Sequence, residues 1–278
     1  MNHERKKMCY GVCTWIFGEK DLEEIARKLS EFGYDGVELF GDWELYPPKL
    51  ARRVLSEHGL RVFSLTPKDV DLAHPASKIR KQAIDYYLRL LDFAAFLEAP
   101  LVSCHGMSGR IRPISTQQEE EHLFYEAICF LAERARKLGI RLVLEGLNRY
   151  ESYFLNTASQ LRTFVEKIDT SLVGILLDTY HMNIEEADLV NAIYTAGDRL
   201  FLFHVADSNR RGIGQGHISF PPLFRALKDV RYSGPIIVEC TAPGPDPFTP
   251  VKEGNWYEIV LDDVKKSLNE LKTLDLCS

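Results

Sequence analysis

Short apolar runs alternate with longer amphipathic segments along the whole 278-residue chain. Short apolar runs are typical of buried strands, whereas apolar positions at three- and four-residue spacing indicate helices. Strands are therefore expected at Met8–Cys13, Gly36–Phe40, Arg61–Leu65, Pro100–Cys104, Arg141–Glu145, Val173–Asp178, Leu200–His204 and Pro235–Glu239. Helices are expected at Leu22–Phe32, Pro48–His58, Ile79–Leu97, Gln117–Leu138, Ala158–Ile168, Leu189–Ala196, Pro221–Lys228 and Tyr257–Leu271.

Each expected strand is followed by an expected helix, and eight such units predict an α/β protein with a closed parallel barrel, the TIM (β/α)8 fold. Glycine directly follows four of the helices, at Gly33, Gly59, Gly139 and Gly197. Glycine is favoured where a helix ends, so these positions support the order helix, glycine, strand. Because no Gly/Ser-rich linker divides the chain, we expect a single barrel domain over residues 1–278.

Four of the expected strands in the second half end in an acid or a histidine. The runs LVLEG, GILLD, LFLFH and IIVEC contain Glu145, Asp178, His204 and Glu239. Such a group at the end of an apolar strand is costly unless it is paired or bound to a cation, and barrel strands all end at one mouth. The four are therefore expected to share one divalent cation. Three carboxylates and one imidazole favour Mn²⁺, with Co²⁺ or Mg²⁺ as alternatives, over zinc.

The composition fits a barrel enzyme that acts on a small molecule. With 45% hydrophobic residues the chain can bury one large core, and its net charge of −6 argues against a nucleic-acid partner. The six cysteines lack CxxC spacing, which favours a reducing cytoplasm. The basic start MNHERKK and the apolar run after it lack a small-residue cleavage site, so no signal peptide is expected. No stretch looks long enough to span a membrane.

Several segments of the second half keep the order and spacing of motifs in a known family. They are LEGLNRYESYFLNT (Leu144–Thr157), LLDTYHMNIEE (Leu176–Glu186), FHVADSNR (Phe203–Arg210) with Gly212–His217, and VEC (Val238–Cys240). On these segments the chain resembles the xylose-isomerase-like barrels, and within them the D-tagatose 3-epimerase-like ketose epimerases. Only Phe32–Leu39 matches in the first half, and Gly146 replaces the proline that usually follows the first ligand glutamate.

The resemblance implies a metal-dependent sugar epimerase that inverts the carbon α to the carbonyl (C3) of a ketose or keto-sugar acid through a cis-enediolate. Matched metal ligands are Glu145, Asp178, His204 and Glu239, and matched substrate-binding residues are Glu151, His181 and Arg210. Glu145 and Glu239 would act as acid and base on opposite faces of the sugar, while the cation stabilises the enediolate. The resemblance also implies a homodimer or homotetramer. No glycine-rich phosphate cradle stands out, which favours a non-phosphorylated sugar.

Other residues near the expected mouth allow two interpretations each. His105 follows the fourth strand and could contact substrate or remain a hydrogen-bonded structural histidine. Trp15, with Phe40 and Trp43, could line an apolar wall for a sugar or close the barrel as core. His217 is expected to shape the seventh loop.

Structural alternatives also exist for three of the matched residues. Asp178 could cap a following helix, and His181 could pair with Glu185 at helical spacing. Arg210 lies in a polar loop, where a solvated charge is the ordinary expectation.

Other functions remain open beside the epimerase. The same barrel could carry out aldose–ketose isomerisation, or inosose-type dehydration of a cyclic polyol ketone. An abasic-site endonuclease would need three zinc ions, but the loop after the seventh strand has Gln215-Gly216-His217 instead of an Asp-x-His pair, and Ser64–Thr66 holds no histidine. A non-catalytic barrel that only binds sugar is the last alternative.

Overall fold

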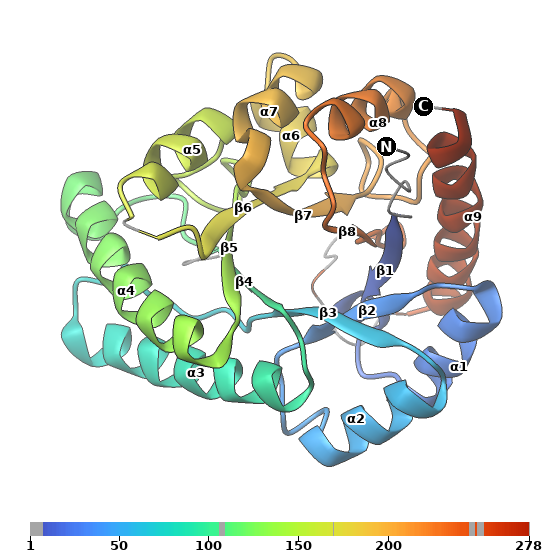
Figure 1. The fold of residues 1–278 in the computed structure, drawn as a ribbon, viewed down its shortest axis with the longest axis horizontal. Coiled ribbons are helices and arrows are strands. Elements are labelled where there is room, and N and C mark those ends of the chain that lie inside the picture. The colour runs from blue at the N-terminus through green and yellow to red at the C-terminus, as the bar shows by residue number, and fades with distance from the viewer. Residues whose placement is uncertain (1–7, 106–108, 169, 245–247, 249–252, 278) are drawn as a thin grey trace, which may run out of the picture.

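The strands of the chain close into one parallel barrel (Figure 1). The computed structural model describes residues 8–105, 109–168, 170–244, 248 and 253–277. Eight strands follow one another in chain order, and the last pairs with the first. The strands are β1 (Cys9–Cys13), β2 (Gly36–Phe40), β3 (Arg61–Thr66), β4 (Leu101–Cys104), β5 (Arg141–Glu145), β6 (Val173–Asp178), β7 (Leu200–Val205) and β8 (Pro235–Val238). The predicted TIM barrel is confirmed.

The helices surround the barrel on its outer side (Figure 1). They are α1 (Leu22–Phe32), α2 (Pro48–Glu57), α3 (Ser77–Phe96), α4 (Gln117–Leu138), α5 (Ala158–Glu166), α6 (Thr179–Glu185), α7 (Leu189–Ala196), α8 (Phe220–Asp229) and α9 (Trp256–Cys277), with 3₁₀ turns η1 (Thr14–Phe17) and η2 (Gly197–Arg199). Most predicted bounds hold to within two residues, but α9 continues beyond the predicted end at Leu271. The described helices include none that combines the length and apolarity needed to cross a bilayer.

One helix is absent from the predicted set because it is too short to show a period, although a helix capped by Asp178 was one of the alternatives. Helix α6 has seven residues and begins directly where β6 ends. Asp178 starts it, since the Asp178 carboxylate accepts a hydrogen bond from the Tyr180 N–H at 2.9 Å. Helix α6 therefore places the residues after β6, including His181, at the mouth of the barrel.

Three of the four glycines noted after helices end them in the expected way. Gly33 and Gly139 have left-handed backbone conformations, and Gly59 also has a positive φ. Gly197 differs, because its φ of 52° and ψ of −128° lie outside the left-handed helical region and it opens the turn η2. Glycine at these positions avoids the clash of a Cβ atom with the backbone.

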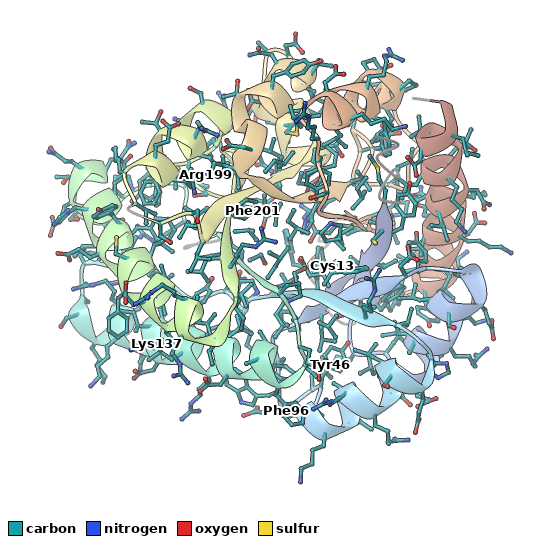
Figure 2. All side chains as sticks on the ribbon, viewed as in Figure 1. Cys13, Tyr46, Phe96, Lys137, Arg199 and Phe201 are labelled. Carbon is teal, nitrogen blue, oxygen red and sulfur yellow. The ribbon has the colours of Figure 1, made fainter. Side chains whose placement is uncertain are left out.

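Apolar side chains fill both the barrel and the space between barrel and helices. Cys13 and Tyr46 are buried, whereas Lys137 lies on the outer face of α4 (Figure 2). Both faces of a parallel barrel strand are covered, so the strands are almost continuously apolar. The exceptions to this rule are the buried polar groups near the carboxyl ends of the strands, and they define the site.

Candidate active site

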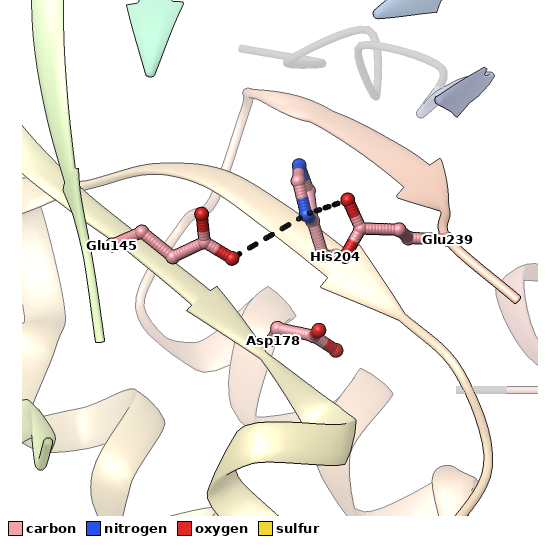
Figure 3. A group of neighbouring side chains, drawn as sticks. All are labelled: Glu145, Asp178, His204 and Glu239. Carbon is pink, nitrogen blue, oxygen red and sulfur yellow. Dashed lines mark ion pairs between the residues drawn. The ribbon is translucent and has the colours of Figure 1, made fainter. Parts of the chain in front are cut away.

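Four ionisable side chains from consecutive strands meet inside the barrel mouth (Figure 3). Glu145 and Asp178 end β5 and β6, His204 is the penultimate residue of β7, and Glu239 follows β8. One ligand atom of each lies within 4.8 Å of the others, and all four side chains are buried. His204 Nδ1 is 3.6 Å from Glu239 Oε1 and 4.0 Å from Glu145 Oε1. The expected convergence of these residues is therefore observed, and we refer to them as the strand-end cluster.

Two atoms of the strand-end cluster are suited to a cation because they lack a hydrogen-bond partner. Asp178 Oδ2 and His204 Nδ1 are buried and make no hydrogen bond within the part of the chain that the structure describes. A buried polar atom without a partner is uncommon and calls for an explanation. Asp178 also caps α6 through its other oxygen, so the structural alternative and a ligand role are compatible. The three carboxylates and the imidazole fit a hard divalent cation.

The surrounding charges push the pKa values of the two glutamates in opposite directions. Burial and the charge of Glu239 raise the pKa of Glu145 well above its usual range. Burial would also raise the pKa of Glu239, but the charges of His204 and Arg210 outweigh burial and hold it below its usual range. Burial and Glu239 raise the pKa of Asp178 to about 7. The surroundings therefore separate the proton affinities of the two glutamates, which is a common feature of acid and base pairs.

A buried glutamate that the sequence analysis did not single out lies on the other side of His204. Glu38 of β2 is fully buried, and its Oε2 is 3.3 Å from His204 Nε2. Burial would lower the pKa of His204, but the charges of Glu38 and Glu239 raise it well above its usual range. The available signal was a glutamate in the apolar run GVELF. It was missed because Glu38 lies inside a strand and not at its end.

Arg210 is buried beside the cluster, so its interpretation as a solvated surface charge is wrong. Its side chain is only 7% exposed, and it pairs with Glu151 at 3.2 Å and with Glu239 at 3.3 Å. Burial would lower the pKa of Arg210, but the carboxylates of Glu239 and Glu151 raise it. Its guanidinium also lies 4.7 Å from the ring centroid of Tyr180 and 5.6 Å from that of Trp15. Arg210 therefore presents a fixed positive charge at the mouth.

His181 points a ring N–H toward the cluster. The Asn148 N–H donates to His181 Nδ1 at 3.1 Å, so the proton of the neutral ring is on Nε2. Burial and the charge of Arg210 lower the pKa of His181 well below its usual range. His181 Nε2 is 3.7 Å from Asp178 Oδ2 and finds no hydrogen-bond partner among the described residues. It is a neutral donor available to a bound molecule.

The alternative pairing of His181 with Glu185 is wrong. Glu185 instead forms an ion pair with Arg149, in which Nη2 and Oε2 are 2.8 Å apart. Because Glu185 pairs with Arg149, the His181 ring contacts Asn148 through Nδ1 and faces Asp178 through Nε2.

The aromatic and histidine candidates near the mouth separate into different roles. Trp15 Nε1 donates to Glu239 Oε1 at 2.7 Å, and its ring stacks on Phe248 with centroids 5.6 Å apart. Burial lowers the pKa of His105, and the buried His105 Nδ1 makes no hydrogen bond that the described residues can provide. His217 Nδ1 lies 2.9 Å from Ser208 Oγ, which fits the expected loop-shaping role. Trp43 packs on Tyr86.

Comparisons with known proteins agree with this geometry. Residues 26–262 match the family model described as xylose isomerase-like TIM barrel. A D-psicose 3-epimerase of Agrobacterium fabrum is 44% identical over 77% of this chain and 77% of its own length. A ketose 3-epimerase of Arthrobacter globiformis is 30% identical over 83% of this chain and 82% of its own length. The crystal structure of a D-allulose 3-epimerase from Methylomonas sp. superposes with a TM-score of 0.86 at 26% identity, covering 97% of this chain and 98% of that one.

Proposed function

The chain belongs to the xylose isomerase-like TIM barrel family, and from that membership we propose that it is a metal-dependent ketose 3-epimerase. The observation that carries the proposal is the pair Glu145 and Glu239. These glutamates extend from opposite sides of the strand-end cluster (Figure 3), and their pKa values are shifted in opposite directions. Inversion of a carbon needs one base and one acid on opposite faces, and this pair provides both.

Glu145, Asp178, His204 and Glu239 would hold the cation, which we take to be Mn²⁺, with Co²⁺ or Mg²⁺ as alternatives. When bound, the cation would supply Lewis acidity at the carbonyl oxygen of the ketose and at the neighbouring hydroxyl. The unpartnered atoms Asp178 Oδ2 and His204 Nδ1 support this assignment.

The two glutamates divide the proton transfers between them. The carboxylate of Glu239, which Arg210 and Trp15 contact, can accept the proton from C3 of the sugar. Glu145, which faces the cluster from the other side (Figure 3), can deliver a proton to the opposite face when its carboxyl group is protonated. The two residues exchange roles for the reverse reaction. The intermediate between the two transfers is a cis-enediolate of the sugar.

His181 and Arg210 would stabilise the negative charge that develops on the enediolate oxygens. His181 donates its Nε2–H in the neutral form, and Arg210 supplies a permanent charge that Glu151 orients at 3.2 Å. Trp15 would support the C–H face of the sugar while it donates to Glu239, and His105 would contact a sugar hydroxyl through its unpartnered Nδ1. These residues bind and orient, and they do not transfer the proton.

Product analysis in D₂O tests the proposal. Purified protein with Mn²⁺ is incubated with D-psicose, D-tagatose and L-ribulose, and the products are analysed by NMR. We expect inversion at C3 with deuterium at the inverted carbon. A shifted carbonyl would indicate an isomerase, loss of water a dehydratase, and inversion at another carbon a different epimerase. No exchange with any ketose would overturn the proposal and would favour a barrel that only binds sugar.

We also propose that the chain acts as a homodimer or homotetramer in the cytoplasm and that residues 1–278 form a single domain. Closure of the barrel by β1 and β8 supports one domain, because the two strands join distant parts of the chain. Size-exclusion chromatography with light scattering measures the mass of the protein directly. The mass of a monomer would refute the proposed oligomer.

A further inference from the structure

Glu38 connects β2 to the strand-end cluster, and polar side chains surround its carboxylate. Its side chain is fully buried, and burial of an isolated carboxylate costs several kcal/mol. The groups that compensate this cost are Ser64 Oγ, which donates to Oε2, Thr66 Oγ1, which donates to Oε1, and Cys13 Sγ at 3.7 Å from Oε1. The remaining contact is His204 Nε2, at 3.3 Å from Oε2. The surroundings of Glu38 thus hold its carboxylate against one edge of the imidazole.

The contact with Glu38 decides which nitrogen of His204 carries the proton. An ionised carboxylate accepts hydrogen bonds and cannot donate, so His204 Nε2 must be the donor. In the neutral ring the lone pair is then on Nδ1. His204 Nδ1 faces Glu239 at 3.6 Å and Glu145 at 4.0 Å and makes no hydrogen bond to any residue that the structure places. A lone pair directed at two carboxylates is unfavourable, so this orientation of the ring calls for positive charge between them, either a proton on Nδ1 or, in its place, a bound cation.

We infer that Glu38 is a positioning residue for His204: it holds the Nε2 proton and the orientation of the ring, so that Nδ1 faces the cation position of the strand-end cluster. The inference rests on the proposed function, because it presupposes a divalent cation at that position. Carboxylate partners of ligand histidines fix the ring and raise its basicity, and their loss weakens metal binding by about 10- to 100-fold. Glu38 would act through His204 without touching substrate.

A competing role for Glu38 is direct coordination. Atoms of Cys13, Glu38 and Glu239 also lie within 4.8 Å of one another. Coordination there would take Glu38 away from the hydroxyl groups of Ser64 and Thr66, which already occupy its two oxygens. The positioning role leaves all these hydrogen bonds in place, and we therefore favour it.

The experiment measures Mn²⁺ binding and the identity of the coordinating nitrogen. Free Mn²⁺ is titrated by electron paramagnetic resonance with the wild type and with Glu38→Gln, which keeps the side-chain shape and removes the charge. We expect Kd to rise by about 10- to 100-fold. Two further samples of the wild type carry ¹⁵N-labelled histidine, one at Nδ1 only and one at Nε2 only. In pulsed spectra the coupling of the label to Mn²⁺ should be larger for the Nδ1 sample than for the Nε2 sample. Glu38→Asp, which keeps the charge but withdraws it from Nε2, is the second variant if Glu38→Gln folds poorly.

Glu120→Gln is the matched control, because Glu120 is an equally buried acid that bonds to Arg110 and Tyr153 instead. Its Kd for Mn²⁺ should stay within about twofold of the wild type, well below the change expected from loss of a ligand partner. An unchanged Kd in the Glu38 variants, or a larger coupling from an Nε2 label, overturns the inference while the proposed function stands. A wild type that binds no Mn²⁺ overturns both.

Discussion

Two groups of buried acids lie at the same end of the barrel but differ in how they are paired. In the first, which we call the loop clamp, Glu120 accepts from Tyr153 at 2.6 Å and from the Ser115 N–H at 2.8 Å, and Arg110 bridges it to Asp71. In the strand-end cluster, by contrast, two buried atoms, Asp178 Oδ2 and His204 Nδ1, make no hydrogen bond in the described chain. The clamp ties together three successive βα loops, while the cluster leaves buried polar atoms available to a ligand.

The pKa values express the same contrast. Burial would raise the pKa of Glu120, but hydrogen bonds from Tyr153, Ser115 and Arg110 outweigh burial and lower it to about 2. The pKa of Glu145, in contrast, is raised by burial and by Glu239. Glu120 therefore resembles a structural acid that its partners keep ionised, whereas Glu145 has the perturbed pKa that is common in active sites.

Replacing the cluster glutamates should produce the largest effect. Glu145→Gln and Glu239→Gln keep the shape of the side chain but remove the proton-transfer group. We expect deuterium exchange at C3 to fall by at least about 10³-fold, or about 4 kcal/mol, in each variant. The rate of deuterium incorporation measures it. Glu120→Gln, assayed at low temperature, should stay within about threefold of the wild type because it is outside the cluster. Turnover retained in both cluster variants would refute the two-base scheme.

Replacing the clamp acid should reduce stability instead of activity. Glu120→Ala leaves the charge of Arg110 without its closest partner, at 2.5 Å in the wild type. We expect the free energy of unfolding in urea to fall by about 3 kcal/mol. Glu126→Ala on the same helix is the control, because its exposed side chain should contribute no more than about 0.5 kcal/mol. Equal losses in the two variants would show that the clamp does not stabilise the fold.

Added Mn²⁺ should stabilise the protein only through the strand-end cluster. At a free concentration of 100 times Kd, binding should add about 2.7 kcal/mol to the free energy of unfolding. Asp178→Asn should remove this gain, because asparagine can still cap α6 but lacks the second anionic oxygen. Asp71→Asn alters the loop clamp but should retain the gain in stability from Mn²⁺. Urea titrations with and without Mn²⁺ compare the two, and a gain retained in Asp178→Asn would contradict the site.

Acid should weaken the clamp over a defined pH range. The folded pKa of Glu120, about 2, lies below the unfolded value of about 4.3, so its contribution is present above pH 4.3 and is lost as pH falls toward 2. The difference in unfolding free energy between wild type and Glu120→Ala should therefore shrink by about 1 kcal/mol from pH 6 to pH 3. A difference that stays constant over this range would show that the carboxylate of Glu120 is not held ionised by its partners.

Much of the site could be predicted because its residues share one local signature. Glu145 and Asp178 each end a strand, and His204 and Glu239 lie within one residue of a strand end. In a parallel barrel all such ends meet at one mouth, so the signature implies proximity. Glu38 lacks this signature, although it is as deeply buried as Asp178. The partners of Arg210 were also invisible, because a polar loop sequence gives no sign that its arginine folds inward.

By itself, the sequence determined the order of strands and helices, most of their bounds and the acidic groups at the barrel mouth. Each of these depends on residues close together in the chain, where periodicity reports which side is buried. Only the tertiary structure decided that Glu38 holds His204 across 166 positions and that Trp15 bonds to Glu239 across 224. Such contacts arise when the barrel closes, because closure pairs β1 with β8 and brings side chains of β2 and β7 together, and no local pattern records that proximity.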